Sequence, residues 1–554
     1  MCGIVASIND RKWVDKNNLN HRGPDNTKTT IVDNLTVKFH RLHIIGDPTI
    51  QQPFTDKDNN FLVWCNGEVL NYLELMQEYG ISNKSGCDVE ILPKLFNIIG
   101  IKKTLSKIRG FFSILIYDKI NSKIYTAIDH FGIKPMYFKI ENKKIFFSSE
   151  LRLFDKTNLS KIGIKQYFET MSTISPNTLI DKVYSLSPSQ IICFDTTNPK
   201  NYYSEIYWSI NTQIIGKKNI SYDDIVKNFE RSISRNLIAD HPICNLLSGG
   251  IDSTLLALYS SHGIKENLFF NYENLKKDNF EKQNINNLKK QIKIHELKID
   301  KNNFLENFDE FIESSDEVTY DFASYTYFLL MKNVNKLGHR VILNGTGGDE
   351  LFYGYERYSS TTYIKNFFGF LVNKQPLDNS YDFLKKGFWN SALFGSKIKL
   401  NLEKKDFESK LEYLRFIDFS FYLNNTLLKY TDRISSFFQI ESRVPFLDVD
   451  FVESVFYSKN LSRKIKSKFD LKKMMKKFKI YNKLSFKRKE GLGLPIEKII
   501  SNKDLKNIVL PRIIESDIYN SYLKNIDILN FNFKKRIHIW RIMAIYSLVV
   551  WHEK

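Results

Sequence analysis

The chain has 554 residues, of which 42% are hydrophobic and 14% aromatic, and its formal net charge is +19 at pH 7. This length predicts two or three domains with apolar cores, and the lack of any run of 18 apolar residues argues against a membrane span. The N-terminus has neither the basic nor the apolar region of a secretion signal, so we expect a cytoplasmic protein.

Five cysteines are scattered along the chain, at positions 2, 65, 87, 193 and 244. Their number is odd and no pair has C-x-x-C spacing, which indicates neither a disulfide framework nor a zinc site. A reducing compartment fits this pattern.

Much of the positive charge lies in one tract, where 13 Lys or Arg fall between Arg463 and Lys489 against the single acid Asp470. Such a tract raises the hypothesis of a basic, non-enzymatic protein that binds nucleic acid. We favour a solvated face, or a surface that attracts anionic small substrates, because a charge run alone has weak specificity. Nucleic acid is therefore not an expected partner.

In chain order, the first 205 residues predict short strands at 3–8, 35–45, 60–68, 110–118, 123–129 and 144–149. One clear helical stretch lies among them, around 88–99. These elements indicate a β-rich sandwich with few helices.

The pattern changes after Trp208. A helix is predicted at 220–238, a buried strand at 242–247, a glycine-rich turn at 248–253 and a helix at 254–261. Strand, glycine-rich turn and helix recur at 339–355, and helical patterns dominate beyond residue 400. This order predicts an α/β nucleotide-binding core with a helical C-terminal part, and a domain boundary near 205–220.

The turn SGGIDS, residues 248–253, has the chemistry of a phosphate-binding loop. Its glycines let backbone N–H groups converge on an anion at a helix N-terminus, and Ser248 and Ser253 add hydroxyl donors. No lysine follows, as it would in a phosphoryl-transfer loop, and Asp252 instead suggests magnesium beside a pyrophosphate leaving group. The alternative is a helix N-cap with flexible glycines. Asp349, after the next predicted strand, could complete the metal site.

Cys2 directly follows the initiator methionine. If Met1 is removed, one residue carries both a thiol, with a pKa of about 8.5, and an α-amine, with a pKa of about 7.7–8.0, so the amine can take the thiol proton. The alternative is that Cys2 has no role beyond its place at the N-terminus.

Together, an ordered series of segments resembles the glutamine-hydrolysing asparagine synthetase family. In the N-terminal part the segments are MCGI, HRGPD (21–25), RLHII (41–45), QQP (51–53), NGEVLNY (66–72), CDVE (87–90), GFFSILIYD (110–118), DHFGIKP (129–135) and SSE (148–150). In the C-terminal part they are LLSGGIDS (246–253), GTGGDELFYGY (345–355), TDRISS (431–436), ESRVPFLD (441–448) and RKEGLGLP (488–495).

The resemblance implies two domains. Residues 1–207 would form a class II glutamine amidotransferase domain, an α+β N-terminal-nucleophile hydrolase with an αββα sandwich. Residues 208–554 would form an α/β adenine-nucleotide alpha hydrolase-like domain of the PP-loop ATP pyrophosphatase type. The substrates of the whole protein would be glutamine, ATP and aspartate or another carboxylate, and its cofactors would be ATP and Mg²⁺. The protein could form a homodimer.

The resemblance also implies a glutaminase site. Cys2 would attack the amide carbon of glutamine, and Asn66 and Gly67 would hold the oxyanion. Arg41 would pair with the α-carboxylate, and Glu68 and Asp88 with the α-ammonium, with Asn66 also contacting the substrate.

In the synthetase half, the resemblance implies an ATP site formed by Leu246, Ser248, Gly249, Gly250, Asp252, Ser253, Asn344 and Gly345. Asp252 and Asp349 would hold Mg²⁺ while the acceptor carboxylate is adenylated and ammonia displaces AMP. Lys489 would neutralise the departing phosphates, or be one more cation of the basic tract.

Some positions depart from the family pattern. Thr346 replaces the glutamate of G-E-G-(A/S)-D-E, and a hydroxyl cannot serve as a general base near neutral pH. Gly46 replaces an aspartate, Ile128 an arginine, and DRISS differs from D-R-M-S-M. Aspartate is the first choice of acceptor, and the alternative is a sugar, peptide or β-amino acid.

Overall fold

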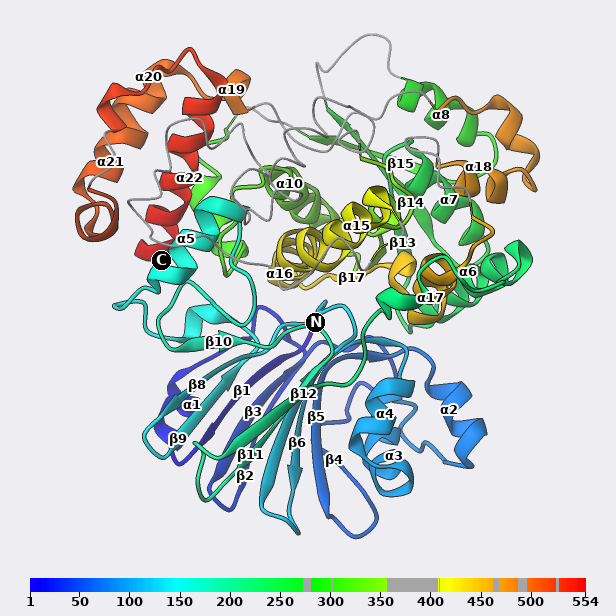
Figure 1. Ribbon diagram of the computed structural model, residues 1–554, viewed down its shortest axis with the longest axis vertical. Coiled ribbons are helices and arrows are strands. Elements are labelled where there is room, and N and C mark those ends of the chain that lie inside the picture. Colours follow the sequence, from blue (N-terminus) through cyan, green and yellow to red (C-terminus); the bar gives the residue numbers. More distant parts are fainter. Residues whose placement is uncertain are drawn as a thin grey trace.

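The structure is a computed structural model that describes residues 1–272, 280–299, 303–355, 407, 409–461, 468–486, 496–524 and 528–554. Lys489, and with it the segment RKEGLGLP, lies outside these residues. Figure 1 shows a β-rich lower part built from the N-terminal residues and an upper part that carries most of the helices. The N-terminus lies where the two parts meet.

The N-terminal part contains two antiparallel sheets. The first has the order β10-β8-β9-β1-β3-β2, with β1 (Gly3–Ile8), β2 (Asn26–Val32), β3 (Leu35–Arg41), β8 (Tyr137–Glu141), β9 (Lys144–Ser148) and β10 (Val183–Ser185). The second has the order β12-β11-β7-β6-β5-β4, with β4 (Phe54–Thr55), β5 (Phe61–Val69), β6 (Gly110–Asp118), β7 (Lys123–Ile128), β11 (Gln190–Asp195) and β12 (Tyr202–Ile206). The six predicted strands are confirmed, to within a few residues at their ends.

The two sheets pack face to face. Their shared core joins Ile4, Ala6 and Val37 of the first sheet to Trp64 and Leu115 of the second. Alternation along the strands places these side chains on the inner faces.

Helices cover the outer faces of both sheets. Helix α1 (Arg11–Lys16) packs on the first sheet, and α2 (Tyr72–Tyr79), α3 (Leu92–Ile99) and α4 (Ile101–Lys107) lie beside the second. The sequence predicted one helical stretch, at 88–99, and the N-terminal part has more helices than that. A 3₁₀ turn (Asp88–Ile91) and α3 do occupy the predicted stretch. Helices of six to eight residues are too short to show a clear apolar period.

The C-terminal part is built on a parallel sheet of order β15-β14-β13-β16-β17. Its strands are β13 (Ile243–Leu247), β14 (Glu266–Tyr272), β15 (Ile294–Ile299), β16 (Val341–Leu343) and β17 (Glu441–Arg443). The strand order reverses between β13 and β16, so the carboxyl ends of these two strands flank a crevice of the kind that binds nucleotides in α/β folds.

Helices surround this sheet and dominate the C-terminal residues, as predicted. Within the described residues, the α-helices are α6 (Tyr222–Asn236), α7 (Ile251–Tyr259), α8 (Phe280–Leu288), α9 (Phe308–Ser314), α10 (Ala323–Lys336), α11 (Gly348–Leu351), α15 (Lys410–Ile417), α16 (Leu428–Phe437), α17 (Val449–Tyr457), α18 (Phe469–Met475), α19 (Ile496–Ile499), α20 (Asn502–Asp504), α21 (Leu510–Glu515) and α22 (Arg536–Glu553). A π-helical segment (Asp418–Leu427) joins α15 to α16. Among the described residues, no helix combines the length and apolar character needed to cross a membrane.

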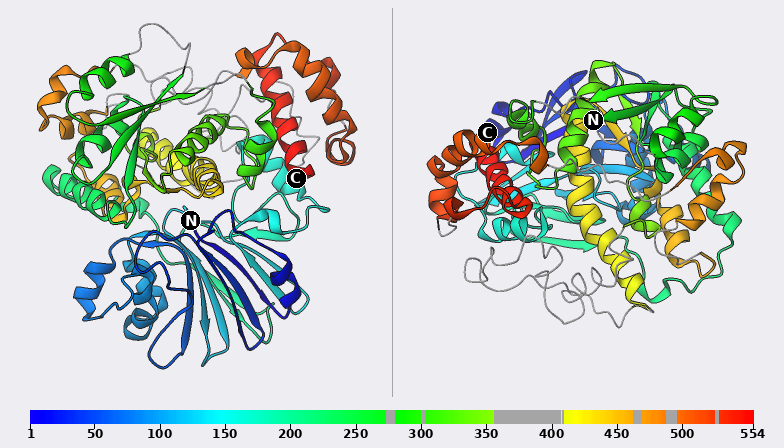
Figure 2. Two further views of the ribbon diagram at one scale, coloured as in Figure 1. Left: turned by 180° about the vertical axis from the view of Figure 1, so that it is seen from behind. Right: turned by 90° about the horizontal axis from the view of Figure 1, so that it is seen from above.

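One segment of the N-terminal half packs against the C-terminal helices. Helix α5 (Lys161–Thr170) lies beside α22 in Figures 1 and 2. The Tyr167 hydroxyl donates a hydrogen bond of 2.8 Å to the carbonyl oxygen of Ala544, and the Lys156 ammonium one of 2.8 Å to that of Trp551. The two halves therefore share part of one apolar core, while the boundary at 207/208 stays a prediction.

Candidate active sites

Cys2 lies directly before β1 and is buried at the core between the two N-terminal sheets. Its Sγ lies 3.8 Å from the carbonyl oxygen of Leu42, and its own carbonyl oxygen accepts a 3.0 Å hydrogen bond from Nε of Arg22. Burial raises the pKa of the Cys2 thiol, while the nearby α-amine and Arg41 act in the opposite direction. Burial also lowers the pKa of the Met1 α-amine to about 5.

Asn66 and Gly67 are neighbours on β5. The Asn66 amide nitrogen lies 3.4 Å from Oγ of Ser113, and among the described residues its buried Oδ1 has no hydrogen-bond partner. Because amide oxygen and nitrogen are assigned from such networks, the unpaired end of Asn66 is equally suited to donate. Gly67 has a φ of 138°, and a Cβ there would lie 2.0 Å from the carbonyl oxygen of Phe111. Only glycine fits this position.

Arg41, at the end of β3, forms hydrogen bonds with the backbone of the loop that follows it. Its guanidinium donates to the carbonyl oxygens of Ile45, Asp47 and Ile50 at 3.2, 2.8 and 2.6 Å. A pairing with the substrate carboxylate stays a prediction.

Glu68 and Asp88 form a buried pair of acids. Burial, followed by the charge of Asp88, raises the pKa of Glu68 well above its usual range. Burial also raises the pKa of Asp88 to about 6, although the backbone N–H of Val69 and the Glu68 side chain hydrogen-bond it. Two acids that resist ionisation together are stabilised by a cation, and an α-ammonium group would supply one.

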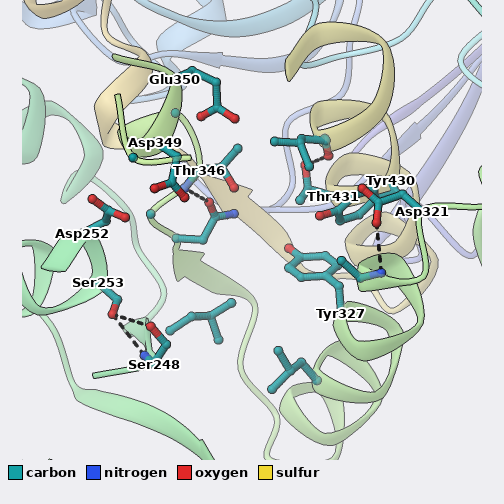
Figure 3. A pocket seen from close by; sticks show the side chains of 18 of the residues that line it. Ser248, Asp252, Ser253, Asp321, Tyr327, Thr346, Asp349, Glu350, Tyr430 and Thr431 are labelled. Atoms are coloured by element: carbon teal, nitrogen blue, oxygen red, sulfur yellow. Dashed lines mark hydrogen bonds between the residues drawn. The ribbon is translucent and has the colours of Figure 1, made fainter. Parts of the chain in front are cut away.

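The phosphate-loop candidate lies between β13 and α7. Ser253 Oγ accepts from the backbone N–H of Ser248 at 3.1 Å and lies 2.9 Å from Ser248 Oγ, as Figure 3 shows. Gly249 has a φ of 82°, and a Cβ there would lie 2.7 Å from the carbonyl oxygen of Glu281. The turn is therefore one that glycine alone accepts, at the N-terminus of a helix.

The second loop, after β16, packs directly on the first. A Cβ on Gly348 would lie 2.8 Å from Cγ of Asp252, and one on Gly345 would lie 3.2 Å from its Cβ. Asn344 holds the loop, because its Oδ1 accepts from the backbone N–H of Thr346 at 2.9 Å. Asp252 and Asp349, predicted to act together, are thus brought to one place (Figure 3).

Lys468 joins these two carboxylates, and the sequence analysis missed it. Its ammonium lies 2.6 and 2.5 Å from the two carboxylate oxygens of Asp252 and 2.6 Å from Oδ1 of Asp349. It is 5% exposed and adopts a φ of 40°, in the left-handed region that bulky residues avoid. The interpretation of the basic tract as a solvated face was therefore wrong at Lys468. The tract itself was the only sign of it in the sequence.

A cavity of about 460 Å³ opens beside the two loops (Figure 3). Six of the eight predicted ATP-site residues line it, and Gly249 and Gly250 do not. The lining also includes the following side chains: Asp321, Tyr327, Thr346, Asp349, Glu350, Tyr355, Tyr422, Tyr430 and Thr431. Burial and the adjacent Asp349 raise the pKa of Glu350 to about 7.

Two departures from the family pattern have structural causes. Gly46 has a φ of 85°, a Cβ there would lie 2.4 Å from the backbone nitrogen of Cys87, and its N–H donates to Asp240 of the C-terminal part at 2.7 Å. Ile128 is buried in the core between the two sheets, where an apolar side chain fits.

A buried ion network connects the two candidate sites. Arg22, whose Nε contacts the Cys2 carbonyl, lies 3.1 Å from Glu150 and 3.3 Å from Asp432 of α16. Lys134 also lies 3.1 Å from Asp432. Thr431, the next residue back along α16, lines the cavity.

Comparisons with known proteins agree with this arrangement. Residues 1–208 match the glutamine amidotransferase domain model, and residues 224–552 match the asparagine synthase model, which spans more than half of the chain. A probable glutamine-hydrolysing asparagine synthetase of Acanthamoeba polyphaga mimivirus is 31% identical over 283 residues, which cover 46% of this chain and 48% of that relative. Asparagine synthetase 1 of Bacillus subtilis is 23% identical and covers 100% of this chain and 96% of its own.

Two further comparisons cover only part of this chain. The asparagine synthetase of Gallus gallus is 27% identical over 64% of this chain and 67% of its own. A solved glutamine phosphoribosylpyrophosphate amidotransferase of B. subtilis covers 47% of this chain and 64% of its own, with 16% identity and a TM-score of 0.29, which is too low to support an argument. On the two domain matches, the chain belongs to the asparagine synthase family and carries a glutamine amidotransferase domain at its N-terminal end.

Proposed function

We propose that the protein is a glutamine-dependent asparagine synthetase that uses ATP. It hydrolyses glutamine at Cys2 and transfers the ammonia to an aspartate that has been activated by adenylation. The observation that carries the proposal is that one chain holds both kinds of site. One combines a buried N-terminal cysteine with a pair of acids suited to an ammonium group, and the other combines a glycine-rich loop with two carboxylates. Full-length similarity to an asparagine synthetase supports it.

In the N-terminal domain, we propose that Cys2 is the nucleophile once Met1 has been removed. The two packed sheets with helices outside support the assignment to the N-terminal-nucleophile hydrolases. The Cys2 amine would take the thiol proton, which burial otherwise holds on sulfur, and return it to the leaving ammonia. Asn66 and the Gly67 N–H would donate to the oxyanion, and Glu68 and Asp88 would bind the ammonium group.

In the C-terminal domain, the two loops would hold the triphosphate. Ser248 and Ser253 would donate to phosphate oxygens at the N-terminus of α7. Lys468 would balance the negative charge that grows on the departing pyrophosphate, because it is buried beside the same loop. The same role for Lys489 stays a prediction, because Lys489 lies outside the described residues.

Asp252 and Asp349 would hold Mg²⁺. The Lys468 ammonium lies against both carboxylates, which shows that their oxygens converge on a place that accepts a positive charge, and carboxylate oxygens are ligands that Mg²⁺ prefers. When bound, the ion would neutralise phosphate charge.

The acceptor would enter the cavity beside Thr346. Asp321 and Glu350 line it and suit an ammonium group, which an amino-acid acceptor has and a simple sugar acid lacks. This supports aspartate, or another acceptor with an amino group, over a sugar acid. Thr346 favours the second candidate, an amidotransferase with another carboxylate acceptor, because it supplies no carboxylate where the family pattern has one.

One assay tests both candidates. The protein is incubated with ATP, magnesium, glutamine and a panel of carboxylates, and pyrophosphate and amide product are measured. Pyrophosphate release that requires aspartate and yields asparagine supports the proposal. Release with a sugar, peptide or β-amino acid, and none with aspartate, replaces it with the second candidate. Tight nucleic-acid binding with a steep salt dependence and no amide product would revive the third hypothesis. Cytoplasmic location and a homodimer stay predictions.

A further inference from the structure

Three potential metal ligands meet at the amino-terminal edge of the parallel sheet. Cys244 is the second residue of β13, Glu266 is the first residue of β14, and His339 lies two residues before β16. Cys244 and Glu266 are register partners on adjacent parallel strands, so their side chains share a face of the sheet. The three positions are 22 and 73 residues apart, which is why no spacing in the sequence indicated a site.

The side chains are close together and buried. Cys244 Sγ lies 3.3 Å from Nδ1 of His339, whose Nε2 lies 3.3 Å from Oε1 of Glu266. One ligand atom from each residue lies within 4.8 Å of the other two. A tetrahedral zinc ion with sulfur, nitrogen and oxygen ligands separates them by about 3.3–3.8 Å. The cluster therefore needs only a small contraction and a turn of the imidazole to bring a single ring nitrogen to the ion.

The chemistry of the three side chains suits a metal. A neutral imidazole binds divalent cations through a ring nitrogen, and a thiol gives up its proton when it becomes a metal ligand.

Two lysines limit the negative charge at this place. Lys293 lies 3.6 Å from Oε2 of Glu266, the oxygen that does not face His339. The positive charge of Lys265 favours the thiolate form of Cys244. Oε1 is thus the oxygen that faces His339. Cys244 is 0%, His339 6% and Glu266 8% exposed, so the last two offer a route from the surface.

We infer that Cys244, Glu266 and His339 form a site for a zinc-like divalent cation, with water as the fourth ligand. Sulfur, imidazole and carboxylate together select zinc over magnesium, which prefers oxygen. The site lies at the opposite end of β13 from the phosphate loop, about 10 Å away over three residues of strand. Binding would join β13, β14 and the chain that enters β16, and would release one proton from Cys244.

The test uses the full-length protein, stripped of metal with a chelator and titrated with Co²⁺ in excess Mg²⁺. We expect one equivalent of Co²⁺ to bind with a near-ultraviolet thiolate band, to be displaced by Zn²⁺, and to release close to one proton. Cys244→Ser should lose the band and bind at least tenfold more weakly. The matched control Cys193→Ser removes another buried thiol and should keep both.

His339→Gln keeps the thiol and should also weaken binding at least tenfold, which decides the matter if Cys244→Ser does not fold. Wild-type protein that gives no thiolate band at one equivalent overturns the inference. A band that persists in folded Cys244→Ser overturns it too. In either case the cluster is a hydrogen-bonded chain of thiol, imidazole and carboxylate without a metal.

Discussion

The two candidate sites differ in how the chain builds them. The candidate glutaminase site takes Cys2 from just before β1, Arg41 from β3, and Asn66, Gly67 and Glu68 from β5, and Asp88 lies in the 3₁₀ turn that follows α2. All of them fall within the first 88 residues. The candidate synthetase site combines the loops after β13 and β16 with Lys468 near α18 and residues of α10 and α16. Its parts span more than 200 residues.

This difference decides what a motif can reveal. In the first site, residues next to each other in the sequence, such as Asn66 to Glu68, stay next to each other in the site because a strand holds them in register. In the second, the decisive pairing of Asp252 with Asp349 and Lys468 depends on which strands become neighbours and on where α18 begins. A change in one site should therefore leave the chemistry of the other site intact.

The largest expected effect is that of Cys2→Ala. Glutamine-dependent synthesis and glutaminase activity should both be lost, because no other group could form the thioester. Synthesis from added ammonia should persist at near the wild-type rate, since the proposed adenylating site lies in the C-terminal part. The measurement is asparagine formed from glutamine and from ammonium salts. Residual glutaminase activity in this variant would contradict the assignment of the nucleophile.

The next predictions concern substitutions in the candidate synthetase site, which should affect synthesis and spare glutamine hydrolysis. Asp252→Asn, Asp349→Asn and Lys468→Met should each lower acceptor-dependent pyrophosphate release by about 10²–10³-fold, because the two aspartates would hold Mg²⁺ and the lysine, which contacts both, would lie beside the phosphates. Glutaminase turnover should be spared. Lys476→Met is the control for Lys468→Met, because Lys476 closes the same helix, α18, and is exposed. Equal losses in the two lysine variants would mean that the basic tract acts only through its total charge.

Much of the fold was predictable from the sequence, since strands such as 3–8 and 110–118 are short, nearly continuous apolar runs that are followed by turn residues. Lys468 was not, because nothing local distinguishes it from the other 12 cations of its tract. Its burial depends on Asp252, which lies 216 residues away. Cys244 and His339 illustrate the same limit, since only strand pairing brings them together.

The acid pair of the glutaminase site gives a smaller, pH-dependent effect. The pKa of Asp88 is raised to about 6 and that of Glu68 is also raised, so protonation on going below pH 6 removes the charge that attracts the substrate ammonium. The KM for glutamine should therefore rise as pH falls through 6, while the KM for ATP changes little. Glu68→Gln should raise the KM about 10–100-fold at pH 7.5, the size of a charged hydrogen bond.

The control for that variant is Glu78→Gln, which changes an exposed glutamate paired with Lys107 on the surface. It should leave the KM for glutamine unchanged. A flat KM between pH 7.5 and 5.5 in the wild type would show that the pair does not bind the ammonium group.

The smallest expected effect concerns Thr346, where this chain departs from its family at the cavity itself. If aspartate is the acceptor, Asp321 and Glu350 already supply carboxylates to the cavity, and Thr346→Glu should hold or raise asparagine formation by at most about tenfold, or 1.4 kcal/mol. If the cavity instead serves another acceptor, the added charge would lie unpaired near the reacting carboxylate and would depress turnover. Comparing wild type with Thr346→Glu and the isosteric Thr346→Val, on aspartate and on competing carboxylates, separates the two. A gain confined to aspartate would mean that the threonine replaced a group the reaction still uses. A loss confined to a different acceptor would mean that the cavity has been reshaped around that acceptor, although the phosphate loop beside it is unchanged.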